Sequence, residues 1–288
     1  NGQPYGYLLT AWACGLRHPK SLSKAALAKV DIRSVRGPLS SQCLGLPDET
    51  PFGDPAFLLP SLHLAKTNTT YAGKTVCVPH FSDTRSDEEL ICASGAEVIL
   101  RPRLSGTIAD IERFIDAVTS AGFILSGALH GVVTASAYGV PLAFWDSGDI
   151  ALPFKWEDFA ASIGVPCTFV VDVKSAKTHY DRELKHRISI PSMLPSLATA
   201  PFPVRPAALV NTLLHEEKSG QIASRGALEH AQAIFQSANS VQTRISKDNR
   251  QFIEDLLHRV DASDMSSTSS KADAAGRSKG IVSKLLGR

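Results

Sequence analysis

The sequence predicts an α/β fold, in which a parallel sheet carries helices on both faces. Short β-rich runs alternate with helix-like segments from residue 74 to residue 172, which is the pattern of repeated βαβ units. Parallel strands need a crossover between them, so this alternation favours a parallel sheet. The 288 residues, of which 43% are hydrophobic, are enough for one large domain or two smaller ones.

The elements of this region follow from composition and capping signals. Strands are expected at 74–79, 97–102, 123–126, 141–145 and 167–172. A helix should start after Ser86, whose hydroxyl forms a capping box with Glu89, and end at Gly95.

Three further helices are expected between these strands. Helix 107–122 is predicted to be amphipathic and capped by Gly122, and its buried face is expected to hold Ile108, Ile111, Ile115 and Val118. Another helix should lie between strands 123–126 and 141–145, and another at 154–164.

The two ends of the chain differ from this middle region. Residues 1–65 mix short apolar runs with Gly and Pro, and aromatic residues become sparse after about residue 215. A stripe of apolar residues over 251–260 predicts a helix, and 263–280 has the composition of a disordered segment. The basic end, 276–288, can be a peripheral membrane contact or a solvated tail.

Charge and cysteine usage narrow the functional classes. Residues 216–288 carry 11 basic and 9 acidic side chains, which leaves 19 of each in residues 1–215. A neutral body argues against nucleic-acid binding as the main task. The five cysteines form no CxxC pair, so we expect neither a zinc site nor a disulfide framework, and reduced cytoplasmic thiols.

The start of the chain lacks the features of a secretory signal. It begins at Asn1, and the first residues have no basic start followed by an apolar run and a small-residue cleavage site. No apolar run is long enough to span a bilayer. We therefore expect a cytoplasmic chain from which some N-terminal sequence is missing.

His130 lies in the first turn after the predicted strand 123–126, between Gly127 and Gly131. Ligands of open α/β sheets bind beyond the carboxyl ends of the strands, where helix N-termini attract anions. An imidazole there can donate to an anion or move a proton. The alternative is a structural histidine that caps a neighbouring carbonyl.

Arg36 stands at a second turn of this kind. It precedes a helix that Pro38 should start and Gly45 should end. It could bind a phosphate or carboxylate through two parallel hydrogen bonds, or it could be a surface arginine. Asp54, just before Pro55, is most simply a turn residue.

Five stretches within residues 30–170 together resemble the polysaccharide pyruvyl transferase family, especially its exopolysaccharide ketal pyruvate transferases of the xanthan and succinoglycan type. They are VRGPLSSQCLGL, GDPAFLLP, VCVPHFSD, SGALHGVVTASAYGVPLAF and FKWEDFAASIG, in this order. The resemblance implies a GT-B-like pair of Rossmann-like domains, the first incomplete, and phosphoenolpyruvate as the donor. It divides the chain into the end of the first domain (1–65), a second domain with the Leu-His-Gly motif (66–215) and a helical, partly disordered tail (216–288).

The resemblance also places the functional residues. The family's motifs fall on Arg36, His80, Ser126, Leu129, His130, Gly131, Phe154, Lys155, Asp158 and Phe159. It implies His130 and His80 as catalytic residues, and Arg36, Ser126, Leu129, Gly131 and Lys155 as donor-binding residues. Lys155 and Asp158 can equally be helix neighbours on a surface.

One position departs from the pattern of many family members. They carry Arg directly before Leu-His-Gly, where this chain has Ala128, although the exopolysaccharide subgroup often has a small residue there. Another cation must then hold the donor. Arg36, Lys155, Arg101 and Arg103 are the candidates, with Asp158 as a further possible site residue.

The expected reaction forms a pyruvate ketal on a sugar of an exopolysaccharide or of its lipid-linked precursor. Phosphoenolpyruvate is a co-substrate, and no cofactor or metal is expected, since no HExxH or Asp-x-Asp spacing occurs. Lipid-linked acceptors would place the protein at the inner face of the membrane. Asp146 and Asp149 could meet acceptor hydroxyls, although a polar turn is the simpler interpretation.

Two alternatives stay open from the residues alone. The first is a nucleotide-sugar glycosyltransferase on the same fold, with Glu157 or Asp158 on the ribose hydroxyls. The second is a catalytically silent module of polysaccharide assembly.

Overall fold

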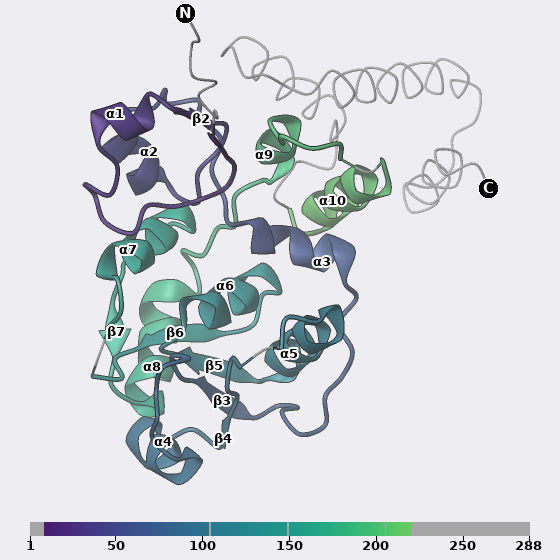
Figure 1. Cartoon of the computed structure of the whole chain (residues 1–288). Coiled ribbons are helices and arrows are strands. Elements are labelled where there is room, and N and C mark those ends of the chain that lie inside the picture. The colour runs from purple at the N-terminus through teal and green to yellow at the C-terminus, as the bar shows by residue number, and fades with distance from the viewer. Residues whose placement is uncertain (1–8, 104, 149, 205, 221–288) are drawn as a thin grey trace, which may run out of the picture. The chain divides into compact units, whose positions relative to one another are not determined.

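The computed structural model describes residues 9–103, 105–148, 150–204 and 206–220. By its contacts the chain divides into two units, Asn1–Met193 and Leu194–Arg288 (Figure 1). The domain boundaries predicted after residues 65 and 215 stay predictions.

A five-stranded parallel sheet forms the centre of the first unit, which confirms the predicted α/β class. Its strands are β3 (Thr75–Val78), β4 (Val98–Ile99), β5 (Phe123–Ser126), β6 (Leu142–Trp145) and β7 (Phe169–Val170), in the spatial order β4-β3-β5-β6-β7. The chain moves outward from β3 to β4 and then returns to the other side of β3 to form β5. The strand order therefore reverses between β3 and β5, where open α/β sheets bind their ligands.

Helices cover both faces of this sheet, as predicted. They are α4 (Asp87–Ser94), α5 (Ile108–Ser120), α6 (Leu129–Ala137), α7 (Pro153–Ser162), α8 (Val173–His179) and the π-helix η2 (Tyr180–Leu184). Val76 and Val78 pack with α5, α6 and α7, whereas Cys77 packs with α4 and α8 on the other face. This alternation follows from the two-residue period of a strand and yields a core on each face.

The capping signals hold, but the predicted face of α5 is partly wrong. Ser86 and Glu89 make both bonds of the capping box of α4, and Gly95 takes the left-handed conformation after it. In α5, Ile108 and Ile111 are 76% and 40% exposed. The buried stripe runs instead through Phe114, Ile115, Ala117 and Val118, and the C-cap is Ala121, not Gly122.

A smaller parallel sheet precedes the large one in the chain. It consists of β1 (Leu9–Ala11) and β2 (Val30–Ile32). The same part of the chain contains α1 (Lys24–Leu27), α2 (Pro38–Leu44), the 3₁₀ helix η1 (Pro55–Leu58) and α3 (Leu59–Leu62). Pro38 is the first residue of α2 and Gly45 its left-handed C-cap, as predicted. Beyond the strand ends, Val35 bridges in parallel to Cys14 and to Phe52, so the chain segments before Gly15, Arg36 and Gly53 end side by side.

The described part of the second unit contains α9 (Leu194–Ala198) and α10 (Pro206–Lys218). The helix predicted at 251–260, the disordered segment at 263–280 and the basic end lie outside the described residues, as does Asp149. Within the described ranges, no helix has both the length and the apolar character that crossing a membrane requires.

Candidate functional site

A cavity of about 490 Å³ lies within the first unit, where the small sheet meets α6, α7 and η1. Its lining residues are Ala13, Cys14, Gly15, Arg17, Arg36, Asp54, Pro55, Ala56, His130 and Lys155. The residues after β1 and β2 form one wall, and the first turns of η1, α6 and α7 form the other. Its size is that of a small-molecule site, and four of its ten lining residues carry cationic or imidazole side chains.

Arg36 is the central cation of this cavity. The residue is only 7% exposed, yet its Nε and Nη2 atoms are buried without a hydrogen-bond partner. Nε–H and Nη2–H lie on the same edge of a guanidinium group, which is the edge that grips a carboxylate or phosphate with two parallel bonds. A buried donor without a partner costs free energy, so an anion that accepts both bonds would be stabilised here.

Asp158 lies next to the Arg36 guanidinium group and does not line the cavity. It is fully buried, it accepts hydrogen bonds from Ser40 N (2.9 Å) and Ser40 Oγ (2.7 Å), and its Oδ2 is 3.7 Å from Arg36 Nη2. That last distance is an ion pair but not a hydrogen bond. Asp158 thus caps the N-terminus of α2 from α7 and holds the turn that carries Arg36. The idea that it is a surface neighbour of Lys155 is wrong.

The turn after β1 fits closely against the guanidinium group. A Cβ atom on Gly15 would lie within 2.4 Å of Arg36 Nη2. Ala13 has a positive φ of 52°, and Leu152, which precedes the first residue of α7, has a φ of 56°. Such conformations cost about 1 kcal/mol or more in residues other than glycine. Strain of this kind next to a cavity is typical of binding sites.

The cations around the cavity affect one another. Burial lowers the pKa of Lys155, and the positive charges of Arg36 and Arg17 lower it further. Repulsion of this kind is relieved when an anion binds between the cations. Asp54, the acidic residue of the lining, accepts a hydrogen bond from Ala56 N and caps η1, which is the turn role predicted for it.

The first turn of α6 brings His130 to the cavity. The His130 side chain is exposed, and the N-terminus of α6 has no side-chain cap. The positive end of the helix dipole there favours an anion, although Gly131 N and Ala128 N already donate to Ala128 O and Ser126 Oγ. Among the described residues, neither a side chain nor a backbone carbonyl hydrogen bonds to the imidazole ring, so the capping role considered for it is absent here.

Ser126, Leu129 and Gly131 shape this turn and do not line the cavity. Ser126 Oγ is fully buried, accepts from Ala128 N (3.1 Å) and donates toward Ala128 O and Val78 O. Gly131 is required by this arrangement, because a Cβ there would lie 2.4 Å from Ser126 Oγ. Leu129 packs against the core. Their predicted contact with the donor stays a prediction.

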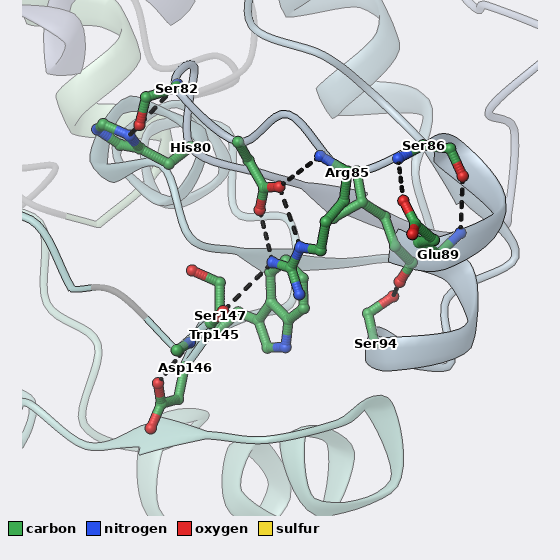
Figure 2. Close-up of polar contacts among 12 residues, drawn as sticks. His80, Ser82, Arg85, Ser86, Glu89, Ser94, Trp145, Asp146 and Ser147 are labelled. Atoms are coloured by element: carbon green, nitrogen blue, oxygen red, sulfur yellow. Dashed lines mark hydrogen bonds and ion pairs between the residues drawn. The ribbon is translucent and has the colours of Figure 1, made fainter.

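His80 follows β3, next to the turn that carries His130. Its backbone N lies 3.7 Å from where a Cβ on Gly127 would be. Its Nδ1 is 2.6 Å from Ser82 Oγ and accepts a longer bond from Ser82 N (3.4 Å) (Figure 2). Because an amide N–H can only donate, the neutral ring carries its proton on Nε2. His80 does not line the cavity, and its catalytic role stays a prediction.

Two arginines brace the loop that carries His80, called here the β3 loop (residues 79–86). Arg85 donates two bonds to Asp83, donates to Ser147 O and lies over the Trp145 ring at 5.2 Å (Figure 2). Arg101 binds Asp87 and the carbonyl oxygens of Asp83 and Arg85. The second half of the loop is therefore held by charge-assisted bonds.

The structure brings together some of the predicted residues and separates others. Arg36, His130 and Lys155 share the cavity, whereas Arg101 is engaged in the β3 loop and Arg103 is an exposed residue outside the lining. Arg17 is a cavity residue that the sequence reasoning missed. The signal would have been its place after β1, because β1 and β2 are parallel neighbours whose ends share an edge.

Asp146 forms the polar turn predicted as the simpler alternative. Its Oδ1 accepts a hydrogen bond from Gly148 N (3.0 Å), and the side chain is exposed.

Comparison with known proteins agrees with the resemblance in the sequence. The succinoglycan biosynthesis protein ExoV of Rhizobium meliloti (strain 1021) is 31% identical over 137 residues, which are 47% of this chain and 41% of that protein. The chain thus spans about two-fifths of the length of this relative. No solved structure shows significant similarity to this chain. A family model described as polysaccharide pyruvyl transferase matches residues 8–144, a range that includes Arg17, Arg36, His80 and His130. Residues 8–144 of this chain are therefore similar to the polysaccharide pyruvyl transferase family, in agreement with the motifs of the sequence.

Proposed function

We propose that the protein transfers pyruvate from phosphoenolpyruvate to two hydroxyl groups of a saccharide, forming a ketal. The observation that carries this proposal is the unpartnered Nε and Nη2 edge of Arg36, buried beside a cationic cavity. Phosphoenolpyruvate is a compact trianion with a phosphate and a carboxylate. Arg17, Arg36 and Lys155 supply three positive charges around the space it would fill.

The reaction balances without a redox partner. Two hydroxyl oxygens bond to C2 of the donor, and the bond between C2 and the phosphate oxygen breaks. The two hydroxyl groups lose one proton each. In the overall balance, one proton is added to the methylene carbon, which becomes a methyl group, and the other leaves with the phosphate. His130 is the proposed proton donor to the methylene carbon, because its ring is free of other partners at the cavity.

The fold offers a framework for this proposal. The carboxyl ends of the small parallel sheet and the N-terminal turns of α6 and α7 meet at the cavity. Two parallel sheets that face a common cleft are the plan of a GT-B fold, and we propose that the small sheet is part of the first domain of such a pair. An acceptor on a lipid carrier, and a position at the inner face of the membrane, belong to the same proposal.

The direct test is phosphate release from phosphoenolpyruvate in the presence of a saccharide acceptor. We expect phosphate and a pyruvylated sugar in equal amounts. Release of a nucleoside diphosphate from nucleotide sugars would favour a glycosyltransferase instead. Binding of saccharide with neither reaction would favour a silent assembly module. The assay should use both this chain and a longer polypeptide extended to the length of the ExoV relative, so that a missing part is not mistaken for a missing activity.

Gly15→Ala is expected to weaken donor binding by about tenfold, with little loss of stability. The added Cβ would displace the Arg36 guanidinium group, which is the end of a flexible side chain, and φ at Gly15 is not positive. Titration calorimetry with phosphoenolpyruvate and a thermal unfolding curve would measure both effects. Gly37→Ala is the contrasting variant, because its Cβ would meet the backbone oxygen of Asp158 at 2.2 Å and should lower the melting temperature. Equal donor affinity in Gly15→Ala and the wild type would contradict this account of Arg36.

Donor binding should also depend on the protonation of Lys155. Its lowered pKa means that it loses its proton at a lower pH than a free lysine does. The charged form binds the trianion, so donor affinity should fall as the pH rises through this pKa. Arg17→Gln removes one of the repelling charges and should move the fall to higher pH. Calorimetry from neutral to alkaline pH would measure both curves, and the same midpoint in the two proteins would contradict the coupling.

A further inference from the structure

We propose that the β3 loop carries a subsite for one ring of the acceptor saccharide, with Phe81 as its platform and His80 at its edge. This proposal rests on the proposed function, because it concerns the second substrate of the same reaction. It begins with Phe81, whose side chain remains 66% exposed although it is large and apolar.

Single exposed apolar residues are common and need no explanation. Phe81 differs because of the loop that holds it. Arg85 fixes the segment just after it through Asp83 and Ser147 O (Figure 2). Arg101 fixes the same segment through Asp87 and the carbonyl oxygen of Asp83. The loop is thus ordered by hydrogen bonds from two arginines to carboxylate and carbonyl groups, yet it leaves its aromatic ring in solvent. An ordered ring can bind a ligand without a large loss of conformational entropy.

The position of Phe81 is that of a second substrate. Val78 at the end of β3 pairs with Ser126 at the end of β5, and neighbouring strands lie about 4.8 Å apart. His80 and Phe81 follow β3, while the turn that leads to His130 follows β5. The loop therefore stands beside the donor cavity, on the other side of the point where the strand order reverses. An acceptor there could present its hydroxyls toward the donor.

The chemistry of the loop fits a pyranose ring. One face of such a ring carries C–H groups with a weak positive partial charge. The face of an aromatic ring carries a negative partial charge and attracts them. Its rim carries hydroxyls, which need donors and acceptors. The His80 ring lies 4.4 Å from the Phe81 ring and is tilted by 46° to it, and its Nε2–H can donate to a rim hydroxyl.

The surroundings favour a sugar over a protein partner. The neighbours of Phe81 in the loop are polar, namely His80, Ser82, Asp83, Thr84 and Arg85. A single ring surrounded by polar groups matches one sugar ring, whereas a stable protein interface needs a larger apolar core. The occupant we propose is therefore a hexopyranoside unit of the acceptor.

The test measures glycoside binding to the full 288-residue chain by saturation-transfer NMR. The probes are the methyl β-glycosides of glucose, galactose and mannose. Phe81→Ser should weaken binding of the preferred glycoside by about tenfold, equal to about 1.4 kcal/mol, and Phe81→Trp should restore it. Val171→Ser is the matched control, because Val171 is 63% exposed and lies outside the β3 loop. It should bind like the wild type.

Each outcome decides the proposal. No glycoside binding by the wild type, wild-type binding by Phe81→Ser, or equal loss in Val171→Ser would overturn it, as would capture of a protein partner through Phe81 with no glycoside bound. Phosphoenolpyruvate affinity, measured in the same samples, separates the two proposals. If the glycoside binds through Phe81 but phosphoenolpyruvate does not bind at all, the proposed function fails and the saccharide subsite stands.

Discussion

His130→Ala is expected to reduce acceptor-dependent phosphate release by about 10²- to 10⁴-fold, which is the range for loss of a general acid. The ring reaches the cavity from the first turn of α6 and has no hydrogen-bonding side chain among the described residues. Because it is exposed, its removal should leave the fold intact. The loss should therefore appear in kcat, with an unchanged melting temperature and at most a modest change in donor affinity.

His63→Ala is a useful comparison for this variant. His63 is a partly buried structural histidine whose Nε2 lies 2.8 Å from Asp116 Oδ1. Its replacement should lower the melting temperature and spare the chemistry of the folded fraction. If His130→Ala instead unfolds the protein or retains full turnover, His130 has a structural role and the proposed acid must be sought elsewhere.

Arg36→Lys should weaken phosphoenolpyruvate binding by about 100-fold, the second of the two largest effects. Lysine keeps the positive charge and can still pair with Asp158. It lacks the planar edge on which Nε–H and Nη2–H point in parallel, so it cannot make two bonds to one anion. Titration calorimetry would measure the loss directly.

The matched control is Arg33→Lys. Arg33 has a side chain that is only 13% exposed and pairs with Asp31 at 3.1 Å, but it does not line the cavity. That variant should bind the donor like the wild type. If Arg36→Lys bound phosphoenolpyruvate with wild-type affinity, two parallel hydrogen bonds from Arg36 would not be part of donor binding.

Local signals in the sequence were enough for much of the fold. The capping box of Ser86 and Glu89 and the Pro38 and Gly45 ends of α2 depend on residues a few positions apart, and all are found in the structure. The face of α5 shows the limit of such signals. The spacing of apolar residues predicts that one side of the helix is apolar. Which of these residues become buried depends on the sheet against which the helix packs, and Ile108 stays exposed.

The candidate site could be predicted only in part, because its parts come from distant segments. Asp158 and Ser40 are 118 residues apart, and neither residue suggests the other. A local clue did exist, since Phe154, Asp158 and Ser162 recur at four-residue spacing and all are buried. An acidic residue on the buried face of a helix predicts a partner. Arg17 had only a weak signal, its place after β1, because that strand has only three residues.

The central claim is that the donor anion lies against the buried edge of Arg36. A crystal structure of the protein with phosphoenolpyruvate tests it most directly. We expect a phosphate or carboxylate oxygen within hydrogen-bond distance of both Nε and Nη2, with the methylene carbon turned toward His130. Ligand density away from this cavity, with the Arg36 edge still unpartnered, would contradict the account.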